Sequence, residues 1–279
     1  MDILHDISIS DRDFHRLVDF IQKNYGIDLS KKKTLITSRL SHSLHQRGYT
    51  EMAPFLEHLF STKDPDDLEL ILNKLTTNYT YFLRETDHFT YFQNKILPEL
   101  AEKHKQDKVL SIWSAGCSSG EEPYTLSIYL KEFFGSQASQ WDTRILATDI
   151  SQQALAKAQK GLYQMPADMS DAWIRRYFTK DRASGLYQVA PSIRNNVIFR
   201  PFNLMDPIHF RIKFDVIFCR NVMIYFDQPT RDALVRRFWE AMRPGPTSYF
   251  FISHSESLGQ TPLFRLVAPS IYQKSSDSR

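Results

Sequence analysis

The segment from residue 114 to residue 123, SAGCSSGEEP, joins a short apolar run to a helical pattern. Glycine at such a turn lets the backbone bend sharply and approach a ligand, because it has no Cβ to interfere. Gly116 and Gly120 do not form the dinucleotide fingerprint, which needs three glycines in G-x-G-x-x-G order. Glu121 and Glu122 at the helix start would repel a pyrophosphate, but they suit a cationic or hydroxyl-bearing ligand. S-adenosylmethionine, with its sulfonium and ammonium groups, is such a ligand.

Another acidic residue, Asp149, follows the next apolar run, residues 144–148. In a doubly wound fold, an acid at the tip of the second strand accepts hydrogen bonds from ribose hydroxyls. The alternative is structural, because Asp is a preferred N-cap residue and a helix is expected to begin near Ser151. Combined with the glycine turn, Asp149 favours a ligand that carries a ribose.

The glycine turn also matches the nucleophile elbow of α/β-hydrolases, G-x-S-x-G, with Ser118 at its centre. Asp227 and His254 follow in the chain order that such a triad uses. The elbow serine normally follows several strands, whereas a helical region here precedes the first convincing strand. We therefore prefer S-adenosylmethionine-dependent methyl transfer. Two alternatives stay open: a serine hydrolase, and a non-catalytic module that binds S-adenosylmethionine.

The 279 residues, 42% of them hydrophobic, are enough to bury one substantial core and a second, smaller one. Apolar runs are only strand-length, so we expect no membrane insertion, and the N-terminus lacks the regions of a secretion signal. Two cysteines, Cys117 and Cys219, cannot form a disulfide framework, which favours the cytoplasm. The nine histidines show no metal-ligand spacing, so we expect no metal.

Helical periodicity dominates residues 1–77, which we expect to form a small all-α domain. A capping pattern at Ser10 begins the first helix, and Gly26 stops it. Three further helices are expected at 34–47, 50–59 and 66–75.

After another helical stretch at 86–102, short apolar runs alternate with helical segments, which is typical of parallel βαβ units. The predicted fold class is therefore α/β, with a doubly wound, mostly parallel Rossmann-like sheet. Residues 161–195 fit this alternation poorly, and we expect them to form an inserted small antiparallel subdomain with a helix at 173–178 and a hairpin at 185–193. The main-sheet strands are expected at 109–113, 144–148, 197–199, 214–219, 249–253, 264–267 and 271–273, with crossover helices at 123–134, 152–160 and 230–242.

Positive charge gathers between Lys23 and Arg47, where six Lys or Arg residues accompany one acid, Asp28. Such a run is often only a solvated helix face. The functional alternative is a docking surface for an acidic partner, with Lys32, Lys33 and Arg39 as the partner-binding residues. The overall formal charge of +3 is too small to indicate nucleic acid, and no such partner is expected.

Several longer motifs resemble the CheR-type chemotaxis receptor methyltransferases, and the resemblance covers nearly the whole chain. The motifs are TTNYTYFLRE at 76–85, GEEPY at 120–124, ATDI at 147–150, NL at 203–204 and CRNVMIYFD at 219–227. The last of these is long enough to be highly specific. The resemblance implies a bacterial enzyme that methylates glutamate carboxylates on methyl-accepting chemotaxis receptors with S-adenosylmethionine. It also implies a monomer, with a linker at 78–92 that contributes to the cofactor site and a methyltransferase domain at 93–279.

The resemblance also implies roles for individual residues. Arg84 and Tyr225 correspond to the pair that lines the methyl-transfer site. Glu122 corresponds to the contact on the amino-acid part of the cofactor and Asp149 to the contact on its ribose. The other implied cofactor contacts are Asn78, Thr80, Arg84, Asn203, Leu204, Asn221 and Val222.

One segment departs from the family pattern. Family members that tether to a C-terminal receptor peptide carry a longer, glycine-bearing loop in the inserted hairpin. Here only residues 179–184, which contain no glycine, join Phe178 to Gly185. We therefore expect that a receptor tail peptide is not needed, and that the partner is the cytoplasmic methylation helices themselves.

Overall fold

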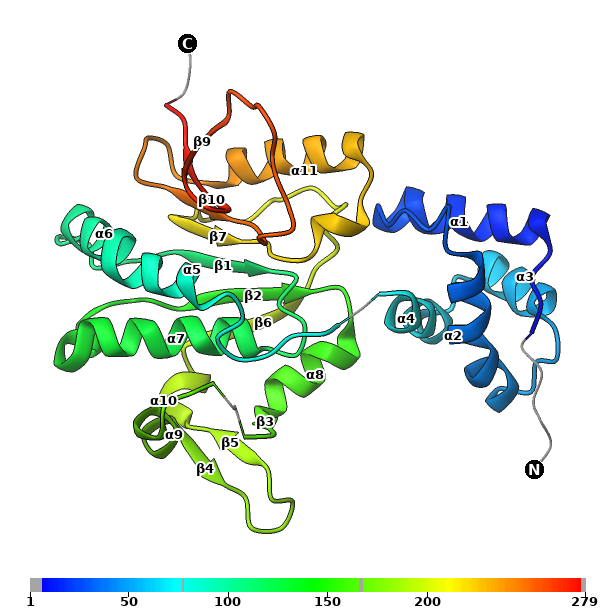
Figure 1. Ribbon diagram of the computed structural model, residues 1–279, viewed down its shortest axis with the longest axis horizontal. Helices are drawn as coiled ribbons and strands as arrows, with labels where there is room; N and C mark the ends of the chain where they lie inside the picture. The colour runs from blue at the N-terminus through cyan, green and yellow to red at the C-terminus, as the bar shows by residue number, and fades with distance from the viewer. Residues whose placement is uncertain (1–6, 77, 166–167, 277–279) are drawn as a thin grey trace. The chain divides into compact units, whose positions relative to one another are not determined.

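The computed structural model describes residues 7–76, 78–165 and 168–276, which form two compact units (Figure 1). The first unit comprises Met1–Asn78 with Tyr225–Thr230, and the second comprises Tyr79–Ile224 with Arg231–Arg279. Residue 77, where we expected the helical domain to end, lies outside the described residues. Every helix in the described part of the chain is too short or too polar to cross a membrane.

The N-terminal part of the first unit is helical, as the periodicity predicts. Ser10 caps the first helix by accepting a hydrogen bond from the Asp13 N–H, and Gly26 ends it with a φ of 72°. The third helix begins and ends later than expected. It ends later because Lys63, rather than a residue near Leu59, takes the left-handed conformation that stops the helix. The helices are α1 (Asp11–Tyr25), α2 (Lys33–Gln46), α3 (Met52–Thr62) and α4 (Pro65–Leu75).

The second unit contains a seven-stranded sheet in the order β6-β2-β1-β7-β8-β10-β9. The five strands from β6 to β8 are parallel, and β10 pairs with β8 and β9 in antiparallel fashion. This confirms the predicted mostly parallel, doubly wound sheet. The strands are β1 (Ile112–Ala115), β2 (Ile145–Asp149), β6 (Val197–Pro201), β7 (Val216–Phe218), β8 (Tyr249–Phe251), β9 (Phe264–Ala268) and β10 (Ile271–Lys274).

Aromatic side chains pack the two faces of this sheet. Phe250 contacts Phe238 on one face, whereas its neighbour Phe251 stacks on Phe218 at 4.1 Å between ring centroids. Successive side chains of a strand point to opposite faces, so this alternation explains why β8 is apolar throughout. The crossover helices are α7 (Glu121–Phe134), α8 (Gln152–Lys160) and α11 (Gln228–Ala241), with short turns η2 (Gly135–Gln140) and η3 (Met223–Tyr225).

The stretch expected as one helix at 86–102 is interrupted by a π-helical turn. It consists of α5 (Thr86–Tyr91), η1 (Phe92–Ile96) and α6 (Leu97–Lys103). Pro98 has no N–H to donate to the preceding turn, so the regular α-helical hydrogen bonding is interrupted there. The π-helical turn lies just before this proline.

A small three-stranded antiparallel sheet forms the insertion, outside the β6 side of the main sheet (Figure 1). The predicted hairpin at 185–193 is wrong in its position, because β4 begins immediately after the helix and pairs with β5 across a turn at 181–186. Residues 187–189 are a single strand, and Pro191 then starts a short helix. The elements are β3 (Leu162–Tyr163), α9 (Asp171–Tyr177), β4 (Phe178–Lys180), β5 (Tyr187–Val189) and α10 (Pro191–Arg194).

Candidate active site

The carboxyl ends of the five parallel strands lie at one edge of the main sheet. Strand β1 pairs with β2 on one side and with β7 on the other, so β1 is the point where the chain crosses over in opposite directions. Ligands of open α/β sheets bind outside the carboxyl ends at this point. The predicted site residues of this edge are Glu122 after β1, Asp149 at the end of β2, Asn203 and Leu204 after β6, and Asn221 and Val222 after β7.

Two glycines of the turn after β1 allow close packing. Gly116 has a φ of 79°, and a Cβ there would lie 2.3 Å from Cγ2 of Val222. Gly120 has a φ of 95°, and a Cβ there would lie 2.8 Å from the Cβ of Ala158. Both positions therefore require glycine, and the turn approaches the segment after β7 closely.

Asp149 is buried at the tip of β2 with both carboxylate oxygens fixed. One oxygen accepts from the Ser118 N–H at 2.7 Å and the other from the Ser151 N–H at 2.9 Å. The N-cap of α8 is Ser151, whose side chain accepts from the Ala154 N–H, so Asp149 is not the capping residue. Burial raises the pKa of Asp149, although the backbone donors act in the opposite direction. Together with Ile150, three backbone donors act on this carboxylate, which leaves it acceptor capacity for a ligand hydroxyl.

Glu122 belongs to a buried ionic network that the sequence did not reveal. Its Oε1 accepts from the Ser114 hydroxyl at 2.7 Å, and its Oε2 lies 3.0 Å from Nη1 of Arg220. Nη2 of Arg220 lies 3.2 Å from Oε2 of Glu85 and also donates to the Arg84 carbonyl. Burial alone would raise the pKa of Glu85, but Arg220 and the Ser253 hydroxyl outweigh it and lower that pKa. The CRN motif could have indicated Arg220, since a charged residue directly after a buried strand needs partners.

Asn221 adopts a φ of 60°, and a second buried carboxylate holds it there. Its N–H donates to Oε2 of Glu256 at 3.2 Å, and its side-chain amide donates to the Ser253 hydroxyl at 2.7 Å. The other oxygen of Glu256 accepts from the Ile224 N–H at 3.0 Å. Burial raises the pKa of Glu256. Glu256 thereby fixes the segment that carries both Asn221 and Val222.

The segment after β6 supplies a polar and an apolar residue to this edge. Asn203 accepts from the Met205 N–H at 3.0 Å, which forms a local turn. The adjacent Leu204 is buried. An apolar wall with an amide beside it can accommodate a planar base.

Arg84 lies beside two exposed tyrosines. Its Nη1 donates to the Tyr79 carbonyl at 2.8 Å, and its guanidinium lies 6.0 Å and 5.8 Å from the ring centroids of Tyr79 and Tyr81. Thr80 is half-buried between these tyrosines in the chain. Exposed aromatic side chains next to a guanidinium are typical of a surface that meets a ligand or partner.

Two predicted site residues, Asn78 and Tyr225, belong to the first unit. Asn78 is exposed, and its amide oxygen accepts from the Thr76 hydroxyl at 3.4 Å. The carbonyl of Tyr225 accepts from the Asp28 N–H at 2.8 Å, which ties this segment to the loop after α1.

The residues proposed for a hydrolase triad have other partners. The ring nitrogens of His254 contact the Ser270 hydroxyl at 3.2 Å and the Asp87 carboxylate at 3.1 Å. Asp227 accepts from the side chain of Gln22 and from the Thr230 N–H. A catalytic histidine must be within hydrogen-bond reach of its serine, and the partners of His254 oppose that role.

One group of side chains has the composition of a metal site. Ligand atoms of Glu85, His88 and His254 lie within 4.8 Å of one another, and both ring nitrogens of the buried His88 lack a hydrogen-bond partner among the described residues. Burial and the Arg220 charge lower the pKa of His88 to about 4. The Arg220 guanidinium next to Glu85 would repel a bound cation. The surroundings therefore suit a neutral imidazole, which packs on His254 with 4.5 Å between ring centroids.

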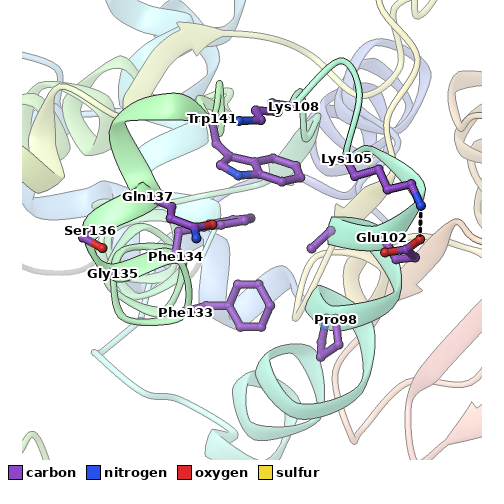
Figure 2. Close-up of a pocket in the computed structure, with 11 residues that line it drawn as sticks. Pro98, Glu102, Lys105, Lys108, Phe133, Phe134, Gly135, Ser136, Gln137 and Trp141 are labelled. Atoms are coloured by element: carbon purple, nitrogen blue, oxygen red, sulfur yellow. Dashed lines mark hydrogen bonds and ion pairs between the residues drawn. The ribbon is translucent and has the colours of Figure 1, made fainter.

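A hollow of about 640 Å³ lies between α6 and the end of α7, and Figure 2 shows the residues that line it. Phe133 and Trp141 line it, with Lys105 and Lys108 at its rim. Because α7 starts at the carboxyl end of β1 and runs back, this hollow lies at the opposite end of the strands. The predicted site residues are not among those that line it.

Both cysteines are fully buried, and burial raises the pKa of the Cys117 thiol and of the Cys219 thiol. A low fraction of thiolate makes a cysteine unreactive, as expected for residues that only line the site.

The basic residues in α2 and at its two caps differ in their partners. Lys32 is exposed, whereas Lys33 pairs with Asp11 at 2.5 Å and Arg39 donates to the Lys74 carbonyl at 3.1 Å. Arg47 pairs with the buried Asp67. Part of the positive cluster therefore stabilises the helical unit itself.

Comparisons with known proteins agree with this geometry. A family model described as "CheR methyltransferase, SAM binding domain" matches residues 78–272, and one described as "CheR methyltransferase, all-alpha domain" matches residues 12–76. A chemotaxis protein methyltransferase of Borreliella burgdorferi is 38% identical over 273 residues, which cover 96% of each chain. The chemotaxis protein methyltransferase of Escherichia coli is 32% identical over 280 residues, covering 97% of this chain and 93% of the relative. The chain therefore belongs to the CheR methyltransferase family.

Proposed function

We propose that this protein transfers a methyl group from S-adenosylmethionine to glutamate carboxylates of chemotaxis receptors, forming methyl esters. The observation that carries the proposal is the orientation of Asp149 at the tip of β2, with both oxygens fixed by backbone N–H groups beside the glycine turn. The match to the family model supports S-adenosylmethionine as the methyl donor. The names of the relatives support a chemotaxis receptor as the methyl acceptor.

The chemistry requires placement more than proton transfer. A glutamate carboxylate has an ordinary pKa of about 4.3, so it is ionised at neutral pH and needs no general base. Its attack on the sulfonium methyl neutralises two opposite charges, which a water-poor site favours. In this proposal no metal takes part, and alignment of the two reactants contributes most of the acceleration.

The predicted residues have two kinds of role, binding of the methyl donor and orientation of the acceptor carboxylate. Asp149 would bind the ribose hydroxyls and Glu122 the amino-acid part of the donor. Arg84 and Tyr225 would orient the reacting carboxylate at the transferred methyl group. The remaining donor contacts would come from Asn78, Thr80, Arg84, Asn203, Leu204, Asn221 and Val222.

Each part of the chain would have its own task. Residues 1–77 would present the basic face to the receptor, and residues 78–92 would link this domain to the donor site. Residues 93–279, with the insertion at 161–195, would carry out the transfer. In this proposal the protein acts as a monomer on the cytoplasmic methylation helices.

The direct test is transfer of labelled methyl groups from S-adenosylmethionine to a receptor cytoplasmic fragment. We expect label on the fragment that alkali releases, because carboxyl methyl esters hydrolyse in base. A fragment with its methylation-site glutamates changed to alanine is the control and should remain unlabelled. Alkali-stable label would contradict carboxylate methylation.

Asp149→Ala should weaken binding of S-adenosylmethionine by about 1.5–3 kcal/mol, because charge-assisted hydrogen bonds to ribose are lost. Calorimetry measures this loss, and Ser118→Ala is the matched control. Ser118 contacts Asp149 through its backbone N–H, which the substitution keeps, so affinity and transfer should remain near the wild-type level. Loss of turnover in Ser118→Ala would instead favour the hydrolase alternative.

Reversal of Lys32 and Lys33 to Glu should raise the apparent KM for receptor several-fold and leave the affinity for the donor unchanged, because exposed charges attract an acidic helix over about 8–10 Å. Adding Arg39→Glu should raise KM further, although it also removes the hydrogen bond to Lys74. The control reverses two exposed residues outside the cluster, Lys63 and Lys95, with the same change in net charge. If the Lys32/Lys33 variant and the Lys63/Lys95 control have equal KM values, the basic cluster is only a solvated surface and not a docking site.

Trimming the receptor C-terminus should change the methylation rate little. A captured tail would add as a strand to a sheet edge, and edge strand β4 has only three residues. The connection differs from the sequence expectation, since Thr179 and Lys180 belong to β4 and the turn includes Gly185 with a φ of 73°. Asp181 nevertheless closes this turn by accepting from the Ser184 N–H at 3.0 Å. Micromolar binding of a tail peptide in calorimetry would contradict the expectation.

A further inference from the structure

The Arg220 guanidinium lies where three parts of the second unit meet. It follows β7 in the chain, contacts Glu122 at the start of α7, and reaches Glu85 in the segment before α5. Its side chain is only 3% exposed, and it lies over the Phe89 ring at 5.3 Å from the centroid. A charge this deeply buried requires paired partners, and the two carboxylates provide them.

The donors of Arg220 are already engaged inside the protein. Nε donates to Glu85 at 3.3 Å, Nη1 donates to Glu122 at 3.0 Å, and Nη2 donates to the Arg84 carbonyl. A side chain so engaged and so little exposed is poorly placed to bind a ligand itself. Its influence on a ligand must therefore pass through the residues that it holds.

Two of those residues, Arg84 and Glu85, lie in a segment with strained backbone. Leu83 and Glu85 both have positive φ values, 61° and 56°, which are unfavourable for residues with a Cβ. Arg220 bonds to the carbonyl of Arg84 between them and to the Glu85 carboxylate. Strained backbone persists where surrounding contacts determine it, and it concentrates at functional sites.

We propose that Arg220 is a positioning residue, which fixes the Glu122 carboxylate for the amino-acid part of the donor and fixes the backbone that carries Arg84. This inference rests on the proposed function, in which Glu122 and Arg84 serve those roles. Arg220 touches neither reactant in this proposal. It couples the donor-binding end of α7 to the segment that presents Arg84.

Lysine cannot replace Arg220 in this arrangement. The guanidinium is planar and carries five N–H donors in a fixed fork, whereas an ammonium is a single point charge. Glu122, Glu85 and the Arg84 carbonyl approach three different nitrogens of the fork. Arg220→Lys therefore keeps the positive charge and loses the bridge.

The test compares two ligands. S-adenosylhomocysteine contains both the nucleoside and the amino-acid part, whereas 5′-methylthioadenosine lacks the amino-acid part. We expect Arg220→Lys to lower the affinity for S-adenosylhomocysteine by about tenfold or more. The reason is that the Glu122 carboxylate, which would meet the ammonium group of the ligand, is no longer fixed. The affinity for methylthioadenosine should fall by less than about twofold, since its contacts lie at the separate Asp149 site. Calorimetry gives both affinities.

An ion pair with a buried carboxylate elsewhere in the same unit is the control. The carboxylate of Asp215, fully buried before β7, lies 3.3 Å from Nε of the half-buried Arg243 and 3.1 Å from Nζ of Lys103. Arg243→Lys perturbs this pair at the opposite end of the sheet and should leave both affinities unchanged. If Arg220→Lys does not fold, Glu85→Gln replaces it, because it loosens the guanidinium and keeps the shape of the carboxyl group. The same selective loss is expected.

Three results would overturn the proposal: unchanged affinity for S-adenosylhomocysteine, equal weakening of both ligands, or the same selective loss in Arg243→Lys. The proposed function fails in a different way. If Asp149→Ala weakens neither ligand, the assignment of the donor site is wrong, whatever Arg220→Lys does. Both proposals are supported if Arg220→Lys selectively lowers the affinity for S-adenosylhomocysteine and Asp149→Ala lowers the affinity for both ligands.

Discussion

Strand β1 lies between β2 and β7, and this arrangement determines where the chemistry can occur. The chain leaves β1 toward β2 and returns on the other side as β7, and the five parallel strands end at one edge of the sheet. Residues separated by more than a hundred positions become neighbours there, and Gly116 lies directly against Val222. The close approach excludes a side chain at Gly116, and the Ser118 N–H of the same turn donates to the Asp149 carboxylate.

Much of this fold follows from local patterns. Strands buried on both faces appear as apolar runs, and all seven strands of the main sheet lie within or beside the predicted runs. Their ends shift by a few residues, since an apolar run does not show where pairing begins. Val109, for example, makes only an isolated bridge to Asp142, and regular pairing of β1 starts at Ile112. The sequence pattern misplaces the inserted hairpin because its first strand continues directly from a helix, with no turn residue to separate them.

The candidate site was less accessible from the sequence. Glu122 and Asp149 stand out from their position after a strand, whereas Asn203 or Tyr225 could equally be a turn or packing residue, and only the family resemblance selected them. The CRN motif points to Arg220 as a charge after a buried strand, but no local pattern indicates its partners. Its hydrogen bonds to Glu85 and Glu122 span 135 and 98 positions, and no periodicity extends over such separations. Contacts of this kind depend on the crossover topology rather than on neighbouring residues.

The aromatic packing of β1 also gives the protein an optical property. Trp113 is fully buried, and its indole N–H donates to the Thr148 hydroxyl at 2.9 Å, one residue before Asp149. Its ring packs against Phe238 and Phe214, away from water. The emission of a tryptophan depends on the polarity around its ring and on its hydrogen bond. Trp113 is therefore a built-in fluorophore beside the tip of β2, and its emission adds to that of the three other tryptophans of the chain.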